Sequence, residues 1–204
     1  DVYKRQSFKS NYIAELLCRM AYLEPSEQDL EQINLPWEDP PFITPTILIH
    51  TTTTRAAKIW SIDQWNRVLE WCSNQGLTVG LVGAPPKRQQ ADYHAGNGEE
   101  QLLERHPTTL IDLRGKTNLI QLAGACKKAT AVVSVDAGPM HVAAAVGTPT
   151  LAVVGNDLNA IGASPIRLWQ PRSPVVQRTI STASCTLCSD NRFRNDGCIA
   201  EEHL

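Results

Sequence analysis

The sequence predicts an α/β protein with a Rossmann-like, doubly wound parallel sheet. Between Thr46 and Val154, apolar runs of strand length alternate with amphipathic stretches of helix length. The runs show little polar alternation, which is typical of strands that helices cover on both faces. Because parallel neighbours need crossover connections, this alternation indicates a sheet with right-handed crossovers.

The expected strands are TILIHT (46–51), TVGLV (78–82), TLIDL (109–113), AVVSVD (131–136) and PTLAVV (149–154). A helix follows the first, since Ser61 can cap it, Gln64 can complete a capping box and Gly76 can end it. A second helix is expected within 88–106, a third from 118 to 128, and a short fourth in PMHVAAAVG.

The chain divides into three parts. Residues 1–45 form an N-terminal helix and linker, expected to be the remnant of a preceding domain, and their segment 24–39 carries six acids and no base. Residues 46–182 are expected to form the Rossmann-like domain, and 183–204 a cysteine-containing tail. The residues from Arg167 to Arg178 are expected to be a loop after the sheet.

Charge and hydropathy exclude several classes of protein. With 19 Lys and Arg against 21 Asp and Glu, the chain has no positive field to recruit nucleic acid. No apolar run approaches the roughly 18 residues of a membrane span, and the N-terminus lacks the apolar core of a signal peptide. We therefore expect a cytoplasmic protein.

The segment VVSVDAGPMHVAAAVG (132–147) indicates an anion site. A buried strand ends at Asp136, a tight turn follows, and Pro139 suits the first turn of a helix. Backbone amides at that helix start, around Gly138 and Met140, would face the ligand-binding edge of the sheet, with His141 as a further donor. From the residues alone, Asp136 could either cap the helix or accept hydrogen bonds from substrate hydroxyls.

This segment, with IDLRGKTNLIQLAGACKKATAVV before it, resembles glycosyltransferase family 9, the bacterial heptosyltransferases. The D-x-G-P-M-H-x-A-A-A core is specific, and the similarity spans about Thr46 to Cys198. The resemblance implies the C-terminal, donor-binding half of a GT-B fold. It also implies that residues 46–182 are a nucleotide-sugar-binding domain, and that a sugar, heptose from ADP-heptose, is transferred to a lipopolysaccharide core acceptor without a cofactor or metal.

The loop HTTTTRAAKIW (50–60) is the second matching segment. Thr54, Lys58 and Trp60 fit the family pattern, whereas Thr51 and Thr52 replace its proline and glycine. A hydroxyl and an ammonium group at this strand end could face a diphosphate across from Gly138, although a lone loop lysine is often only solvated.

The resemblance implies a role for each of these residues in an inverting transfer. Lys58 and Asp136 are expected to be catalytic, the first on the leaving phosphate and the second on the sugar hydroxyls. The substrate-binding set is Thr52, Thr53, Thr54, Lys58, Asp136, Ala137, Gly138, Pro139, Met140 and His141. The resemblance further implies that the general base and the site for the lipid-linked acceptor belong to an N-terminal domain, and no segment of this sequence resembles that domain. We therefore expect the chain alone to bind an adenine nucleotide weakly without turnover, and the full-length protein to be able to associate with the inner membrane.

Two groups of residues have an open assignment. The family often places an acid against the ribose, but Pro86, Lys87 and Arg88 stand there, and Asp92, Glu99 and Glu100 are more simply explained as surface acids. Cys185, Cys188 and Cys198 have the spacing C-x2-C-x9-C and could hold zinc with His203, yet the usual second pair is missing.

Two other functions remain as alternatives. An NAD-binding domain would need G-x-G-x-x-G after the first strand, where this chain has HTTTTRAAK. A non-catalytic module that binds nucleotide sugars would keep the same pocket without transfer. Titration with ADP, UDP and NAD separates the three possibilities.

Overall fold

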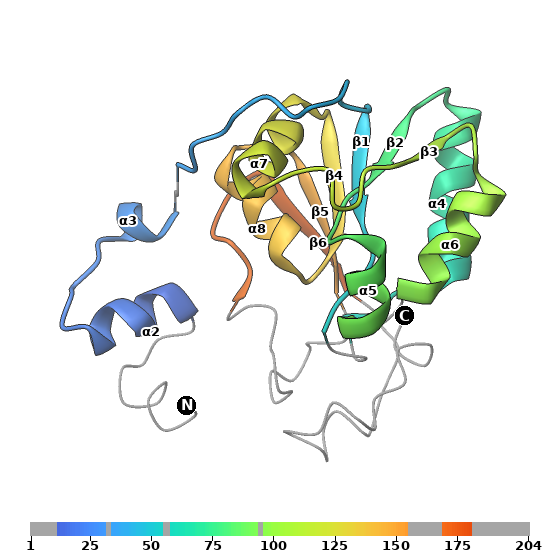
Figure 1. The fold of residues 1–204 in the computed structure, drawn as a ribbon. Coiled ribbons are helices and arrows are strands. Elements are labelled where there is room, and N and C mark those ends of the chain that lie inside the picture. Colours follow the sequence, from blue (N-terminus) through green and yellow to red (C-terminus); the bar gives the residue numbers. More distant parts are fainter. Residues whose placement is uncertain (1–11, 32–33, 55–57, 94–95, 155–168, 181–204) are drawn as a thin grey trace, which may run out of the picture.

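The computed structural model describes residues 12–31, 34–54, 58–93, 96–154 and 169–180. Its centre is a six-stranded sheet in the order β3-β2-β1-β4-β5-β6, in which every neighbouring pair is parallel (Figure 1). The chain builds outward from β1 to β3, then returns to β1 and builds the other half, which confirms the doubly wound fold. The strands are β1 (Ile47–His50), β2 (Val79–Leu81), β3 (Leu110–Asp112), β4 (Ala131–Val135), β5 (Thr150–Val154) and β6 (Val176–Ile180).

Helices cover both faces of the sheet, with α4 and α6 on one face and α7 and α8 on the other (Figure 1). The segment 88–106, expected to hold one helix, instead overlaps two, α5 and α6. The bounds are α4 (Ile62–Asn74), α5 (Pro86–Asp92), α6 (Gly96–Arg105), α7 (Leu119–Lys128) and α8 (Gly138–Ala145).

Local hydrogen bonds explain where the helices begin and end. The Ser61 side chain accepts a hydrogen bond from the Gln64 N–H at 3.3 Å, which confirms the expected cap of α4. Asn118 and Gln121 form a complete capping box at the start of α7. Gly76 follows α4 with a φ of 66°, in the left-handed region that favours glycine at this position.

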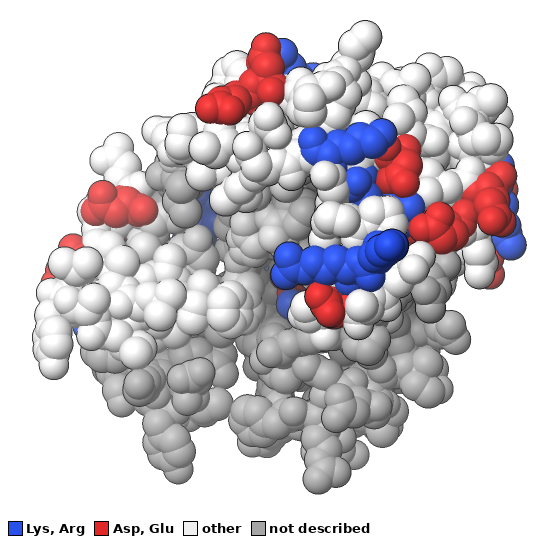
Figure 2. Space-filling model, viewed as in Figure 1, with Lys and Arg blue, Asp and Glu red and all other residues white. Residues whose placement is uncertain are grey.

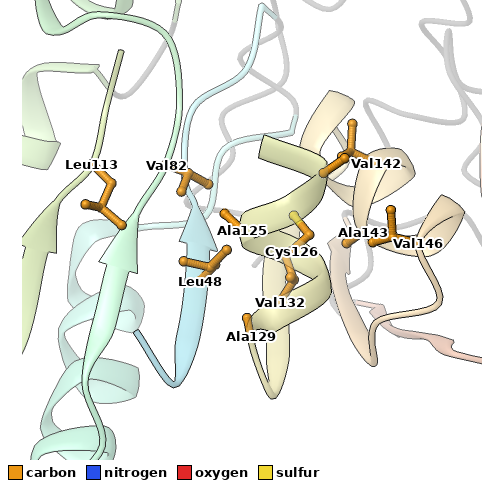
Figure 3. Close-up of a cluster of buried hydrophobic side chains, with 11 residues drawn as sticks. Leu48, Val82, Leu113, Ala125, Cys126, Ala129, Val132, Val142, Ala143 and Val146 are labelled. Atoms are coloured by element: carbon orange, nitrogen blue, oxygen red, sulfur yellow. The ribbon is translucent and has the colours of Figure 1, made fainter. Parts of the chain in front are cut away.

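The apolar core lies in layers on the two faces of the sheet. Consecutive residues of β1 point in opposite directions, so Leu48 packs toward α7 and α8 whereas Ile49 packs toward α4. Figure 3 shows the first layer, where strand side chains such as Leu48 and Val132 meet the small residues of α7 and α8. Because those helices present alanines, they lie close to the sheet and fix the start of α8 at its edge.

The sixth strand corrects the expectation of a loop up to Arg178. β6 pairs along β5, and Arg178 lies within it, donating a hydrogen bond to Gln170 Oε1 at 3.1 Å. Val176 is buried but Gln177, Arg178 and Thr179 are exposed, as is common at an edge strand. The sequence did not predict this strand, because β6 lacks the continuous apolar run that marks the other five strands.

The segment before β1 contains two short helices, α2 (Ile13–Met20) and α3 (Glu27–Glu31). Its last part lies across α7, where the Glu38 N–H donates to the Ile120 carbonyl at 3.2 Å and Lys128 pairs with Asp39 at 2.8 Å. Within the described ranges, no helix has the length and apolar character needed to cross a membrane.

Candidate functional site

A pocket of about 650 Å³ opens at the carboxyl ends of β1, β2 and β4. This is the edge where open α/β sheets bind ligands, at the point where the strand order reverses. The pocket collects residues from separate parts of the chain: the loop after β1, the turn after β2, the start of α7 and the start of α8. From the predicted set it includes Thr52, Thr53, Thr54, Lys58, Asp136, Ala137, Gly138, Pro139 and His141.

Lys58 and Asp136 form an ion pair in this pocket, with 2.6 Å between Lys58 Nζ and Asp136 Oδ2. Their side chains are 21% and 8% exposed, so both groups lie mostly away from bulk water. Each charge neutralises the other in the ligand-free chain. This pairing was not expected, since the family resemblance assigned Lys58 to the phosphate and Asp136 to the sugar. An anion that enters beside Lys58 would share or take over this partner.

The start of α8 has fewer free donors than the sequence suggested. Pro139 has no N–H, and the Met140 N–H donates to the Ala137 carbonyl at 3.2 Å. Met140 is buried in the core beneath β5 and does not line the pocket. The amide of Gly138 remains as the candidate main-chain donor, and a Cβ added to Gly138 would meet no atom within 4 Å.

Two histidines line the pocket and both have a lowered pKa. His141 lies exposed at the rim, where partial desolvation by the surrounding protein lowers its pKa more than the Asp136 carboxylate raises it. His50 is buried at the end of β1, and burial lowers its pKa although backbone hydrogen bonds act in the opposite direction. Since a carbonyl can only accept, His50 Nδ1 donates to the Val82 carbonyl at 2.9 Å. At neutral pH both rings are therefore hydrogen-bonding groups without charge.

The threonines of the β1 loop have different exposures. Thr51 and Thr52 are completely buried and Thr53 is nearly so, whereas Thr54 is exposed. The Thr52 hydroxyl, predicted to bind substrate, donates to Gln89 Oε1 at 2.6 Å. Thr54 is thus the threonine of this loop with an exposed side chain, and it borders the pocket near Lys58.

Several lining residues were missed because nothing in their local pattern marks a site. They include Arg88 and Gln89 of α5, Tyr93, Asn118 and Trp169. Arg88 pairs with Asp92 at 3.4 Å, and both side chains are exposed. Figure 2 shows basic and acidic side chains side by side on this face, including basic groups over α5.

Glu99 corrects a further expectation. It was interpreted as a surface acid, but its side chain is fully buried, whereas Asp92 and Glu100 are 58% and 44% exposed. Its helical spacing to buried Leu102 gave a signal for this, because residues three apart share one face of a helix.

Cys185, Cys188 and Cys198, whose spacing left a zinc site open as an alternative, lie outside the described residues. Among the residues that the structure describes, no cluster of three or more His, Cys, Asp or Glu side chains could hold a metal ion. Elsewhere in the chain, Cys72 and Cys126 are buried, while Cys18 is only partly buried.

The sequence and the fold of this chain are similar to those of known proteins. The sequence profile of glycosyltransferase family 9 (heptosyltransferase) matches residues 19–189, most of the chain. The chain belongs to this family. Of the described residues considered above, the Asp136–Gly138 turn, Lys58 and the β1 loop all fall inside the matched range.

Individual family 9 proteins resemble parts of the chain. The lipopolysaccharide core heptosyltransferase OpsX of Haemophilus influenzae is 29% identical over 110 residues, which is 54% of this chain and 30% of OpsX. Lipooligosaccharide heptosyltransferase 2 of the same organism is 33% identical over 99 residues, 48% of this chain and 28% of that protein. The chain thus spans about a third of the length of the curated relatives it matches.

A solved structure shares the fold. The Escherichia coli heptosyltransferase WaaC with ADP superposes with a TM-score of 0.57 at 19% identity, over 82% of this chain and 48% of WaaC. The parallel sheet of this family 9 chain therefore matches part of the GT-B fold of heptosyltransferases.

Proposed function

We propose that this chain forms the donor-binding half of an inverting heptosyltransferase, with the pocket at β1, β2 and β4 as its site for a nucleoside diphosphate sugar. The observation that carries the proposal is the Lys58–Asp136 pair beside Gly138, one cation and one carboxylate at the ligand-binding edge of the sheet. The family membership and the WaaC structure with ADP favour ADP-heptose as the donor class.

In the proposed transfer reaction, the donor-binding half must stabilise the diphosphate leaving group. An acceptor hydroxyl oxygen attacks the anomeric carbon, the bond from that carbon to the phosphate oxygen breaks, and the electron pair leaves with ADP. Lys58, the Thr54 hydroxyl, the Gly138 amide and the neutral His141 ring supply donors for the charge that develops on that oxygen.

Asp136 then serves the sugar. Once the diphosphate engages Lys58, the Asp136 carboxylate can accept hydrogen bonds from sugar hydroxyls and hold the anomeric carbon in line for attack. Among the described lining residues Asp136 is the sole carboxylate, and it is paired, so we assign the general base that takes the acceptor proton to a second domain. A lipid-linked lipopolysaccharide core acceptor at the inner face of the membrane would bind through that domain as well.

Calorimetric titration with ADP and adenosine tests the proposal. Lys58→Ala should weaken ADP binding about tenfold to a hundredfold, as expected for loss of a charge-assisted hydrogen bond of about 1.5–3 kcal/mol, and should change adenosine binding much less. The matched control is Lys128→Ala, which removes the same charge from the far end of α7 and should leave both affinities unchanged. Equal losses for ADP and adenosine would move Lys58 away from the diphosphate, and tighter binding of NAD than of ADP would contradict the assignment.

A further inference from the structure

Behind the pocket lies a buried charged cluster that the proposed chemistry does not use. Its members are Glu99 of α6, Gln89 of α5 and Arg114 of the loop after β3. The side chains of Glu99 and Arg114 are 0% and 1% exposed, and Gln89 is fully buried. Buried charges are costly unless each finds partners, so the contacts of this cluster need an explanation.

Every partner of Glu99 donates to it. Arg114 Nη1 lies 3.0 Å from Oε2, Gln89 Nε2 lies 3.2 and 3.0 Å from the two oxygens, and the Thr51 hydroxyl lies 2.5 Å from Oε1. Burial raises the pKa of Glu99, while the hydrogen bonds from Thr51 and Arg114 act against that rise. Donors on all sides stabilise the ionised form of Glu99 and so oppose the effect of its burial on the pKa.

Arg114 completes the charge balance. Besides Glu99, its guanidinium pairs with Glu100 and Asp112, each at 2.9 Å. Three carboxylates hold one arginine in place, which ties the loop after β3 to α6. The Arg114 guanidinium is therefore held in one position, and its hydrogen bond in turn orients the Glu99 side chain.

Two threonines connect this cluster to the pocket. Thr51 donates to Glu99 and Thr52 donates to Gln89 Oε1 at 2.6 Å, so the first two residues after β1 are anchored by side chains from α5 and α6. The next residues, Thr53 and Thr54, line the pocket together with Lys58. A Cβ added to Gly83 would lie 2.5 Å from Gln89 Nε2, so the glutamine amide is also confined from the β2 side.

We propose that Glu99, Gln89 and Arg114 are positioning residues that hold the Thr51–Thr54 segment, through the hydroxyls of Thr51 and Thr52, in the arrangement that binds a nucleoside diphosphate. This inference rests on the proposed function for its ligand. None of the three acts on the phosphate through its buried contacts. They restrict the backbone of the segment that carries Thr54 into the pocket. Because this segment is already ordered, ligand binding costs less conformational entropy.

A purely structural cluster would join α5 and α6 to the sheet and affect only stability. The two roles differ in what the loss of a single hydroxyl does. Thr51→Val keeps the shape of the side chain but removes its donor, whereas Thr51→Ser keeps the donor. Thr148→Val is the matched control, because Thr148 is also a buried threonine whose hydroxyl bonds inside the protein, to the Cys126 carbonyl at 2.7 Å, outside the pocket.

The experiment measures urea unfolding, calorimetric affinity for ADP and adenosine, and amide hydrogen exchange of the segment 51–54 for all four chains. We expect Thr51→Val to bind ADP about tenfold more weakly, with a smaller loss for adenosine and faster exchange in 51–54. Thr51→Ser should restore both properties. Thr148→Val should lose a similar amount of stability while keeping its ADP affinity and its exchange in 51–54.

The outcomes separate this inference from the proposed function. A folded Thr51→Val chain that binds ADP and exchanges like the original overturns the positioning role. Equal losses of ADP affinity in Thr51→Val and Thr148→Val overturn it too, since they would reflect stability alone. If the original chain fails to bind ADP, the proposed function fails, and exchange in 51–54 still decides whether the cluster holds the loop. Should Thr51→Val not fold, Thr52→Val tests the same network through Gln89 with the same measurements and outcomes.

Discussion

At the scale of single residues, Gly138 shows how open space can indicate function. A glycine is usually required by a positive φ or by a close neighbour, and Gly138 has neither. Its missing side chain leaves room on the pocket side of the α8 start, beside Asp136 and His141. The space fits a group that approaches the backbone closely, as a phosphate does at a helix N-terminus.

Gly138→Ala should therefore separate binding from stability. We expect the urea midpoint to change little, because the added methyl group meets no protein atom, while ADP affinity falls about tenfold or more as the methyl group blocks the phosphate. Calorimetry and urea unfolding on the same preparation measure both quantities. Unchanged ADP affinity would mean that the phosphate does not approach this helix start.

The ion pair also gives a residue-scale prediction for Asp136. In Asp136→Asn, Lys58 loses its partner and becomes fully available to phosphate, so ADP affinity should be kept or increased. Recognition of the sugar should suffer, so the gain in affinity from ADP to an ADP-sugar should disappear. Calorimetry with both ligands checks this expectation. A large loss of ADP affinity would instead show that the Lys58–Asp136 pair itself maintains the binding site.

At the scale of elements, the segment before β1 is joined to α7 by a close backbone contact. A Cβ on Gly124 would overlap the carbonyl oxygen of Glu38, because the backbone at Glu38 lies directly against α7. The Glu38 amide and Asp39 add a hydrogen bond and an ion pair to α7. The acidic segment that was interpreted as a linker thus packs on the domain at its end.

Gly124→Ala tests this packing. Alanine favours a helix, so an isolated α7 would gain stability, but the overlap with the backbone at Glu38 should cost more, about 1–3 kcal/mol in the free energy of unfolding. Urea denaturation measures the difference. A stability equal to or above that of the original chain would show that residues 38–39 do not rest on α7.

The elements predicted from sequence were those with a strong local signal. The five apolar runs became β1 to β5 because continuous burial leaves its mark in composition, and the Ser61 cap was visible in one turn of sequence. β6 was missed because an edge strand exposes polar residues. The spacing from Glu99 to buried Leu102 indicates a shared helix face, but Arg114, the partner that makes this burial tolerable, lies fifteen residues away on another element. No local pattern reveals that contact.

In the candidate site, too, residues with a local sequence signal were predicted, whereas their tertiary contacts were not. Asp136 and Lys58 were found through a specific motif and a family resemblance, but their pairing is a tertiary contact. Likewise, Thr52, Thr53 and Thr54 were predicted to bind substrate. The structure instead gives the Thr52 hydroxyl, like that of its neighbour Thr51, to a buried partner, and these side chains meet α5 and α6 only in the folded chain.

At the scale of the whole molecule, the fold brings separate stretches of chain to one sheet edge. The reversal of strand order between β1 and β4 opens the crevice, the small residues of α7 and α8 bring the helix start close to the sheet, and the buried Glu99 cluster supports the loop on the other side. In the proposed function these elements form the donor site, and the transfer reaction takes its acceptor site from a second domain.

A crystal structure of this chain with ADP tests the central claim most directly. We predict that the β-phosphate lies within hydrogen-bond distance, about 3 Å, of Lys58 Nζ and of the Gly138 amide, with Lys58 drawn from Asp136 toward the phosphate. Nucleotide bound elsewhere on the chain, with the Lys58–Asp136 pair undisturbed, would contradict the account.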